Sequence, residues 1–571
     1  MPYTSVLFLL GCYTELTVGS DTGLVGLIDG PAADTDTDTD TVTDTVTDTD
    51  TDTTGSPLDG LTDADWAPTA ASDGLPGPVE GVYTDLGVAD EGDGFRALIG
   101  LPIRDEGALA AEIRDLYDPA DRDFRAYLTA DEWVAAYAPT TEDLELIQAY
   151  LEHEGFAVNY VASNRLLIQF SGTVAQFNAA FQADLHVCDR ENPQVGEPSF
   201  EVYCTLESFT LPAFVTDRTN GIITADLPVD PGPLPGEAGD VVNDAPGNAA
   251  LLPQDLANAY GASTLYDEGY DGEGVRLGLI IGGMFKFNDV GTFWRSSGIY
   301  RSVPEVVYTA EDAPSRCTES TLDVAWAGGI APGADLIAYV GPDSRNTSMV
   351  FNFNEAIGRG EVDILSDSFA HRQDSEPWRV EEAYHQAAEM AAALGITVTA
   401  ASGDSAKPDT PCVSPYVTCV GGTTMAMSGD SIAYEYAWEY AGSGEADNFD
   451  APYWQWDVLP TATRRGVNDV SAAAGSAFWV YYLGTWQIYA GTSFASPIYA
   501  GLMAVVDSKR LDEGKPHMGY LNPVLYSDAA VQGTFNDITY GGTAYYSAGA
   551  GWDYPTGWGS PNAAALADAL P

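Results

Sequence analysis

The sequence predicts an α/β protein whose parallel sheet is covered by helices on both faces and preceded by a small α+β domain. Beyond residue 251, short apolar runs alternate with segments of helical periodicity, which is typical of a parallel sheet buried on both faces. Residues 90–225 mix helical and strand-like segments, which is typical of an α+β unit. Apolar residues make up 45% of the 571-residue chain, which is enough for a large core and more than one domain.

The elements of the first unit follow from local periodicity and capping. The predicted helix over 141–151 begins with Thr-Glu-Asp. Carboxylates at a helix N-terminus interact favourably with the helix dipole, so this start suits a helix. The expected elements are a helix carrying Leu109, Ile113 and Leu116, a helix over 141–151, a strand over 164–170 and a helix over 174–181.

The second unit, 251–571, has the continuous apolar strands of a parallel sheet, joined by helices. Residues 226–250 separate it from the first unit and are rich in Pro, Gly and Asp, so we expect a linker that holds a processing site. The expected elements are strands over 275–281, 335–340, 362–365 and 396–400, a helix over 381–394 and an apolar helix over 498–506.

The net charge of −62, from 85 acidic and 23 basic residues, limits the possible partners. Binding to nucleic acid or to anionic lipid headgroups needs a basic surface, which this composition does not supply. Of the acidic residues, 20 precede Arg96, the first basic residue, so part of the charge belongs to the N-terminal segment. We therefore expect no nucleic-acid partner.

The N-terminal segment is expected to lie outside the folded domains. Residues 1–12 contain a short apolar run that ends in Leu-Leu-Gly-Cys, which resembles a bacterial lipoprotein signal and would tether the chain to a membrane through lipidated Cys12. Residues 13–89 include an Asp-Thr run over 34–54, whose like charges repel and cannot fill a core, so we expect an acidic, disordered spacer.

The cysteines fit an oxidising, exported location. Cys188 and Cys204 flank a polar loop and are expected to pair. The pairing of Cys317, Cys412 and Cys419 stays open, because an odd number remains once Cys12 is set aside.

The first candidate for chemistry is Ser493, in Gly-Thr-Ser-Phe-Ala-Ser-Pro ahead of an apolar helix. A serine at a helix N-terminus lies near free backbone N–H groups, which can stabilise an oxyanion. The alternative is an ordinary N-capping serine. Because the wider Gly-Thr-Ser-x-x-x-Pro pattern is more specific than a cap, we interpret Ser493 as a nucleophile.

Carboxylates are better candidates than histidine for the base that would activate Ser493. A histidine base of the subtilisin type usually stands before glycine, and none of the five histidines does. Glu319 and Asp323 are four residues apart, so on a helix they share one face, and their proximity would separate their pKa values. Asp404 follows the 396–400 strand, where α/β sheets place their sites, and a protonated Asp404 could donate to an oxyanion. Taken singly, these residues also fit an acidic helix face and an Asx turn.

The motifs Glu-x-x-x-Asp, Ser-Gly-Asp-Ser and Gly-Thr-Ser-x-x-x-Pro, in this order, resemble the sedolisins, the serine-carboxyl peptidases (peptidase S53). The resemblance implies a subtilisin-like sheet in 251–571, with Ser493 as nucleophile, Glu319 as base, Asp323 orienting Glu319 and Asp404 in the oxyanion hole. Residues 90–225 resemble a pro-kumamolisin-type activation prodomain, which implies a zymogen inhibited by its own prodomain.

The sequence departs from the sedolisin pattern at three positions near the motifs. Asp367 stands where a small or apolar residue is expected, Asn468 where proline is usual, and Ala490 where glycine or serine is usual. None of these departures removes a proposed catalytic group.

The resemblance also implies one structural Ca²⁺ ion near the C-terminus. Asp537 and Asp553 would supply carboxylates and Ile538, Gly549 and Gly551 would supply carbonyls, which are the hard oxygen ligands that suit Ca²⁺. Without the resemblance, the Gly-x-Gly-x-Asp segment fits an ordinary turn.

These expectations describe an extracellular or outer-surface bacterial lipoprotein that hydrolyses protein or peptide substrates at acidic pH. Two alternatives stay open from the sequence: a catalytically silent surface protein that binds through its cleft, and a subtilisin-type serine peptidase. Side-chain specificity, natural substrate, maturation site and oligomeric state are not determined by the sequence.

Overall fold

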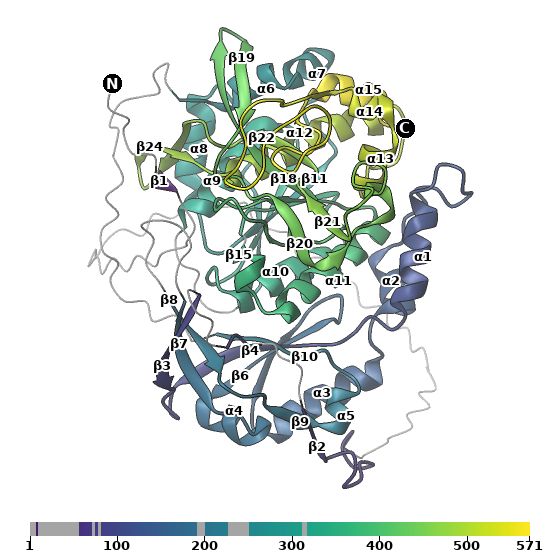
Figure 1. The fold of residues 1–571 in the computed structure, drawn as a ribbon, viewed down its shortest axis with the longest axis vertical. Coiled ribbons are helices and arrows are strands. Elements are labelled where there is room, and N and C mark those ends of the chain that lie inside the picture. The colour runs from purple at the N-terminus through teal and green to yellow at the C-terminus, as the bar shows by residue number, and fades with distance from the viewer. Residues whose placement is uncertain are drawn as a thin grey trace, which may run out of the picture.

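Two units make up the molecule in Figure 1, a lower one from 82–226 and an upper one from 250–571. No helix among the described residues is long and apolar enough to cross a membrane. The predictions for Cys12, the Asp-Thr run over 34–54 and linker residues 227–249 concern residues outside the described part of the chain. The structure is a computed structural model that describes residues 7–8, 56–70, 75–77, 82–190, 200–226, 250–310, 317–369 and 371–571.

The lower unit is built on an antiparallel four-stranded sheet, ordered β10-β4-β6-β5, beside a three-stranded sheet, β3-β7-β8. Its own core gathers aromatic side chains around Phe95, Phe170 and Phe177. The antiparallel sheets and the helices match the predicted α+β unit. Its elements are β2 (Pro68–Ala70), β3 (Tyr83–Val88), β4 (Gly94–Gly100), α1 (Glu106–Leu116), α2 (Ala130–Tyr137), α3 (Thr141–His153), β5 (Ala157–Val161), β6 (Leu167–Thr173), α4 (Val174–Phe181), β7 (Leu185–Arg190), β8 (Phe200–Thr205), β9 (Thr210–Pro212), α5 (Ala213–Thr216) and β10 (Gly221–Asp226).

Helix α4 has the bounds predicted for it, and α3 begins where predicted, because threonines cap both N-termini. Thr140 accepts from the backbone N–H of Asp143, and Thr173 forms a capping box with Gln176. The strand predicted from Asn164 instead begins at Leu167, because the Asn164 side chain accepts from the Leu166 N–H and holds a turn.

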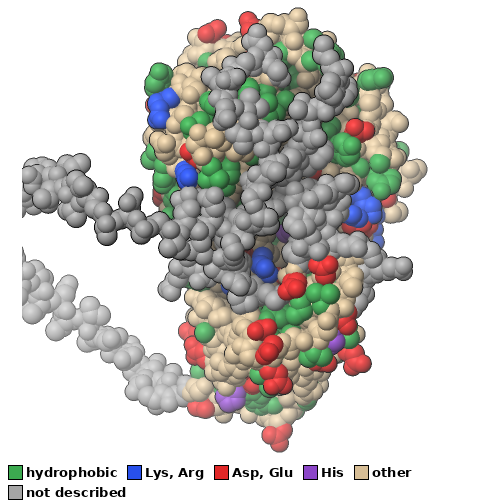
Figure 2. All heavy atoms as spheres, turned by 90° about the vertical axis from the view of Figure 1, so that its left-hand side faces the viewer, with side chains coloured by type: hydrophobic (Ala, Val, Ile, Leu, Met, Phe, Trp, Pro, Cys, Tyr) green, Lys and Arg blue, Asp and Glu red, His purple; other side chains and the backbone are tan. Residues whose placement is uncertain are grey.

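Part of the predicted spacer belongs to the folded unit, which corrects the expectation of disorder over the whole of 13–89. Strand β3 pairs with β7, and β2 pairs with β9. Tyr83 is buried, and its hydroxyl donates to the Ser375 carbonyl in the upper unit. The composition of this stretch hides the strand, because Tyr83 is the only buried residue of β3 while Leu86 and Val88 are exposed, so no buried alternation marks it. Figure 2 shows acidic side chains gathered on the lower unit.

The upper unit is organised around a sheet ordered β12-β13-β11-β14-β16-β18-β19, in which β22 also pairs with β18. Every pairing is parallel except β18 with β19, which confirms the predicted parallel sheet. The strands of this sheet are β11 (Arg276–Ile281), β12 (Glu305–Tyr308), β13 (Asp335–Val340), β14 (Ile364–Asp367), β16 (Thr397–Ala401), β18 (Thr418–Ser428), β19 (Ser431–Ala437) and β22 (Val470–Ala473).

The long helices divide between the two faces of this sheet. Helices α9 (Thr318–Ile330) and α12 (Thr492–Asp512) pack against each other, while α10 (Asn346–Gly358) and α11 (Trp378–Leu394) pack against each other and face the lower unit (Figure 1). Smaller elements complete the unit: α6 (Pro253–Ala259), α7 (Ala262–Glu268), α8 (Phe287–Ser296), β15 (His371–Arg372), β17 (Asp409–Thr410), β20 (Gly444–Asp450), β21 (Arg464–Val467), β23 (Phe478–Tyr482), β24 (Thr485–Ala490), α13 (Asn522–Ser527), α14 (Ala529–Gln532), β25 (Phe535–Asn536), β26 (Ser560–Pro561) and α15 (Ala563–Ala569), with β1 (Leu7–Phe8) pairing with β24.

Two disulfides are described. Cys188 and Cys204 pair across β7 and β8, which confirms the sequence prediction. Cys412 pairs with Cys419, which lies in β18. The second disulfide fixes the loop that follows β16 against the central sheet.

The lower unit docks on the upper one through buried ion pairs as well as apolar side chains. Arg190 Nη2 lies 2.6 Å from Glu376 Oε1, and both side chains are at least 96% buried. Arg96 Nη2 lies 2.8 Å from Asp343 Oδ2 and also donates to Ser348. Because removing one partner of a buried ion pair leaves an uncompensated charge, these pairs oppose separation of the two units.

Candidate active site

Ser493 is the second residue of α12, at the point where β24 turns into the helix. Its side chain is nearly buried, with 4% exposed. Gly491 precedes the helix, and a Cβ on it would lie 2.7 Å from Asp404 Oδ2, so only glycine allows this close approach. At the first turn of α12, the Thr492 N–H donates to Asp404 Oδ1 and the Phe494 N–H to the Gly491 carbonyl, which leaves the Ser493 N–H between them to face a ligand.

Glu319 and Asp323 lie one turn apart in the first two turns of α9, so they share a helix face, as predicted. Helix α9 packs on α12, which brings this face to the start of the nucleophile helix. Glu319 is fully buried and Asp323 is 2% exposed. A burial this complete excludes the solvated helix face that the sequence left open.

Burial raises the pKa of Glu319 well above its usual range, and the charges of Asp323, Asp404 and Asp367 add to this effect. The Ser493 hydroxyl acts in the opposite direction, as a hydrogen-bond donor that favours ionised Glu319. Neither Glu319 carboxylate oxygen has a hydrogen-bond partner with good geometry among the described residues. The Ser493 hydroxyl therefore lies close to Glu319 without forming a well-aligned hydrogen bond to it.

Asp323 is held by Ser368, which the sequence did not single out. Ser368 Oγ donates to Asp323 Oδ1 at 2.7 Å and lies 3.3 Å from the Ser493 carbonyl oxygen. Burial raises the pKa of Asp323 well above its usual range, while the Ser368 bond lowers it and Asp367 raises it. Ser368 follows β14, so its position depends on the sheet rather than on any local motif.

Asp404 follows β16 and lies directly against the start of α12. Its Oδ1 accepts from the Thr492 backbone N–H at 2.8 Å and from the Thr492 hydroxyl at 2.7 Å, while Oδ2 has no partner among the described residues. Burial raises the pKa of Asp404 to about 6, against the lowering effect of the two Thr492 bonds. Below this pH, Asp404 is a neutral acid whose free oxygen can carry a proton beside Ser493.

The histidines of the upper unit are engaged away from Ser493. His371 lies 3.6 Å from Glu376, His385 pairs with Ser414, and His517 pairs with Asp507. In the described part of the chain, the neighbouring groups that change the pKa of Glu319 most are carboxyls and the Ser493 hydroxyl. This arrangement offers a carboxylate base and no histidine base.

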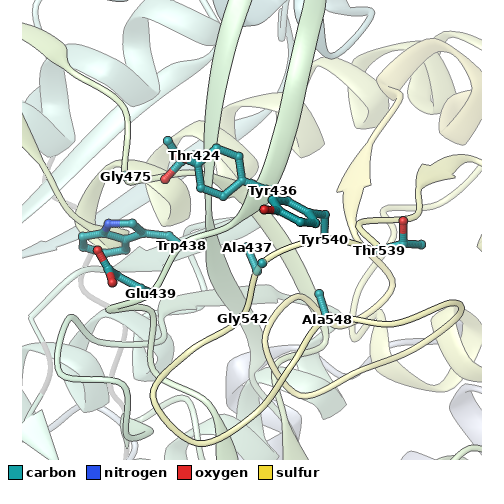
Figure 3. A pocket seen from close by; sticks show the side chains of 11 residues that line it. Thr424, Tyr436, Ala437, Trp438, Glu439, Gly475, Thr539, Tyr540, Gly542 and Ala548 are labelled. Atoms are coloured by element: carbon teal, nitrogen blue, oxygen red, sulfur yellow. The ribbon is translucent and has the colours of Figure 1, made fainter.

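A cavity of about 620 Å³ is lined by aromatic rings from β19 and the loops around it (Figure 3). Gly475, which lines it, follows Ala474, whose carbonyl accepts from the Gly491 N–H. Trp438, which lies against Gly475, begins a segment in which the Gly442 N–H donates to the Gly403 carbonyl, next to Asp404. These backbone bonds link the lining of the cavity to the segments that carry Gly491 and Asp404, while Ser493, Glu319 and Asp404 themselves do not line it.

The five residues implied for calcium lie around a short loop near the C-terminus. The Gly551 N–H donates to Asp537 Oδ2 at 3.0 Å, and the Gly549 N–H donates to Asp553 Oδ2 at 2.6 Å. Burial raises the pKa of Asp553, and the nearby charge of Asp537 adds to it. Ile538 is buried directly after Asp537. The two carboxylates lie near each other, and carboxylate oxygens are the hard donors that Ca²⁺ prefers.

The chain is similar in sequence to known proteins over most of its length. Residues 82–226 match the family model described as Pro-kumamolisin, activation domain, and residues 305–559 match the model described as Subtilase family. Kumamolisin from Bacillus sp. (strain MN-32) is 30% identical over 502 residues, covering 78% of this chain and 86% of kumamolisin. Sedolisin from Pseudomonas sp. (strain 101) is 27% identical over 527 residues, covering 83% of this chain and 87% of sedolisin.

A solved structure extends the likeness to the fold. Pseudomonas sedolisin (serine-carboxyl proteinase), complexed with two molecules of pseudo-iodotyrostatin, superposes with a TM-score of 0.51 at 25% sequence identity. The match covers 57% of this chain and 98% of that chain. The upper unit therefore has the subtilisin-like architecture that the sequence predicts.

Proposed function

The chain belongs to the sedolisin family of serine-carboxyl peptidases, and we propose that it is an exported zymogen that cleaves protein substrates at acidic pH. The observation that carries this proposal is the gathering of Ser493, Glu319 and Asp404 at the start of α12, with no histidine in contact. A peptidase built on these groups needs a negative Glu319 and a neutral Asp404 at the same pH.

In the acylation step, Ser493 Oγ attacks the peptide carbonyl and Glu319 accepts the hydroxyl proton. Asp323, fixed by Ser368, orients Glu319 and holds the second proton of the pair. Glu319 then donates its proton to the leaving amine, and water hydrolyses the acyl-enzyme by the reverse proton path. Glu319 and Asp323 titrate as a pair. The first proton leaves while the other carboxyl is still neutral, so no negative charge repels the new one. The second proton is held strongly, because losing it would place two negative charges side by side.

Asp404 stabilises the oxyanion that forms on the substrate carbonyl. Its protonated Oδ2 donates to the developing negative charge, together with the backbone N–H of Ser493 at the start of α12. As the pH rises through about 6, Asp404 loses this proton and becomes a negative charge facing a negative oxyanion. Activity should therefore be confined to the pH range in which Asp404 is neutral and one proton has left the Glu319–Asp323 pair.

The lower unit is proposed to hold the enzyme inactive until the chain is cut within 226–250. Supporting this role are the buried pairs Arg190–Glu376 and Arg96–Asp343, which tie the lower unit to the upper one near β15 and α10. A cut in the linker would remove the peptide connection between the two units, so that the interface contacts, these ion pairs among them, would then oppose their separation.

Acidification of the purified full-length chain tests the proposal. At about pH 4, the chain should shorten to a product whose N-terminus lies within 226–250, and denatured protein substrate should then be cleaved. N-terminal sequencing and gel analysis of the substrate give the readout. A chain that stays intact and inactive from about pH 3 to 8 would favour the binding protein, and maximal activity near neutral pH would favour a subtilisin-type enzyme.

We also propose that Asp537, Ile538, Gly549, Gly551 and Asp553 hold one structural Ca²⁺, which would neutralise the two carboxylates and stabilise the C-terminal loops. Chelation of divalent ions is expected to lower the Tm by about 2–5 °C, with recovery when Ca²⁺ is restored. The measurement is thermal unfolding of the Ser493→Ala chain, which cannot digest itself. The matched variant Asp537→Asn should lose this response of the Tm to Ca²⁺. A native chain whose Tm does not change when Ca²⁺ is removed and restored contradicts the site.

A further inference from the structure

Asn468 is a fully buried side chain that the proposed mechanism does not use. It lies between β21 and β22, at a position where the sedolisin pattern has proline. Its Nδ2 donates to three backbone carbonyls, those of Gly442 at 2.9 Å, Tyr554 at 3.0 Å and Pro555 at 3.1 Å. Because only the amide nitrogen can donate, these three acceptors fix the orientation of the side chain.

The three carbonyls belong to two segments that are far apart in the sequence. Tyr554 and Pro555 lie in the C-terminal loop, whereas Gly442 lies between β19 and β20. The Asn468 backbone N–H also donates to the Tyr554 carbonyl, and the Trp552 indole N–H donates to the Asn468 carbonyl at 2.9 Å. The backbone of Asn468 is therefore bound to the C-terminal loop, and its side chain attaches Gly442 to the same loop.

The segment that carries Gly442 binds the turn that carries Asp404. The Gly442 N–H donates to the Gly403 carbonyl at 2.8 Å, and the Ala406 N–H donates to the Tyr440 carbonyl at 2.8 Å. A Cβ on Gly442 would lie 1.8 Å from the carbonyl oxygen of the residue before Gly403, so only glycine allows the two backbones to meet. The turn is therefore held on both sides of Asp404.

The Asn468 amide supplies the hydrogen atoms that this junction needs. Three carbonyl oxygens that converge in a buried region repel one another unless a donor lies between them. The amide has two hydrogens for the three oxygens, so one hydrogen is shared. A proline has neither a side-chain donor nor a backbone N–H, so it could form none of the bonds that Asn468 donates here.

We propose that Asn468 is a positioning residue of the oxyanion site, which holds Asp404 in place by tying Gly442 to the C-terminal loop. It acts through Gly442 and Gly403 and does not touch the substrate. Because the Asp404 proton must point at the oxyanion of the transition state, a small displacement of its turn weakens catalysis more than substrate binding. The inference rests on the proposed function, since it takes Asp404 as the oxyanion donor.

The test is a double-mutant cycle between Asn468→Ala and Asp404→Ala in the processed enzyme at about pH 4. Asn468→Ala alone should lower kcat by about 10- to 100-fold and leave KM within a few-fold of native, because the oxyanion forms only in the transition state. In a chain that already carries Asp404→Ala, the same substitution should lower kcat by less than about twofold, since the donor that it positions is gone. Equal losses in the two backgrounds overturn the proposal and leave Asn468 a structural role.

Asn468→Asp tests whether the loss comes from the missing donor or from the missing volume. At about pH 4, a carboxyl buried among carbonyls is neutral, so this variant keeps the size of the side chain and one O–H donor. Its kcat should lie between those of the native enzyme and Asn468→Ala. A kcat as low as that of Asn468→Ala would show that the donor is not what matters, which contradicts the proposal.

Asn354→Ala is the matched control. Asn354 is also fully buried, and its Nδ2 donates to the backbone carbonyls of Val350 and Ala383, which joins α10 to α11. Its loss should lower the Tm and leave kcat within a few-fold of native. A loss of kcat equal to that of Asn468→Ala would show that any buried asparagine has this effect, which contradicts a specific action on Asp404.

A second measurement does not depend on activity. In the full-length Ser493→Ala chain, amide hydrogen exchange over 402–406 and 440–442 reports how firmly the turn is held. Asn468→Ala should speed this exchange by about five- to tenfold, the factor that corresponds to one lost hydrogen bond, and Asn354→Ala should leave it unchanged. Unchanged exchange in Asn468→Ala overturns the proposal.

The two measurements separate this inference from the proposed function. If the native chain has no peptidase activity at any pH, the proposed function fails and the role of Asn468 in catalysis fails with it. If the native enzyme is active at acidic pH but Asn468→Ala and Asp404→Ala lower kcat independently, only the role of Asn468 fails.

Discussion

Replacing Ser493 by alanine is expected to lower kcat by about 10⁴- to 10⁶-fold, because alanine has no oxygen to attack the peptide carbonyl. The small residual rate would come from the oxyanion site and substrate binding alone. The measurement is the initial rate of cleavage of a denatured protein at about pH 4, with the linker of both proteins cut by an added peptidase that is then removed.

Ser496→Ala is the control for this change. Ser496 lies three residues further along α12, is fully buried, and its hydroxyl contacts those of Ser366 and Thr399. Its loss should cost stability of about 1 kcal/mol, typical of a hydrogen bond, and leave kcat within a few-fold of native. If Ser493→Ala kept near-native activity, another group would have to be the nucleophile.

Asp404→Ala is expected to lower kcat by about 10²- to 10³-fold, the range typical of removing one oxyanion donor. Alanine also leaves the Thr492 N–H and hydroxyl without their acceptor, so a second variant is needed to isolate the donor. Asp404→Asn keeps an acceptor for Thr492 and presents an N–H donor at every pH.

The two Asp404 variants differ in their pH profiles. The native alkaline limb near 6 follows from loss of the Asp404 proton, and Asp404→Asn has no such proton to lose, so its activity should extend to higher pH. The profile of kcat between about pH 3 and 8 gives the readout. An Asp404→Asn profile with the native alkaline limb would assign that limb to another group.

The site residues were predictable where they belong to local patterns. The i, i+4 spacing of Glu319 and Asp323, the strand before Asp404 and the helix after Ser493 are all properties of short segments, and the structure has each of them. Their assembly depends on α9 packing against α12 and on the order of β14 and β16 in the sheet. Spacing alone could not predict this assembly.

Other parts of the site come from long-range contacts that carry no sequence signal. Ser368 reaches Asp323 across 45 residues of sequence, and Thr492 reaches Asp404 across 88. Single serines and threonines are too common for the sequence to indicate such roles. Strand β3 escaped prediction for a similar reason, because it is defined by its pairing with β7 and buries only Tyr83.

The acidic composition has separate physical consequences in different parts of the molecule. On the surface, carboxylates remain solvated and contribute little to the chemistry. In the site, burial raises the pKa values of Glu319, Asp323, Asp367 and Asp404, and the charges of neighbouring carboxylates raise those of Glu319 and Asp323 further. Asp404 and one member of the Glu319–Asp323 pair are therefore proposed to keep their protons at acidic pH while the pair carries one negative charge. The proposed chemistry depends on this second group alone.

The pH dependence of kcat/KM for the processed native enzyme tests the central claim, a carboxylate base with a neutral Asp404, most directly. The expected profile is a bell confined to acidic pH, whose alkaline limb lies near 6, where Asp404 loses its proton. A profile that instead rises through the range of histidine titration, about 6 to 7, and stays high at neutral and alkaline pH would contradict the carboxylate mechanism.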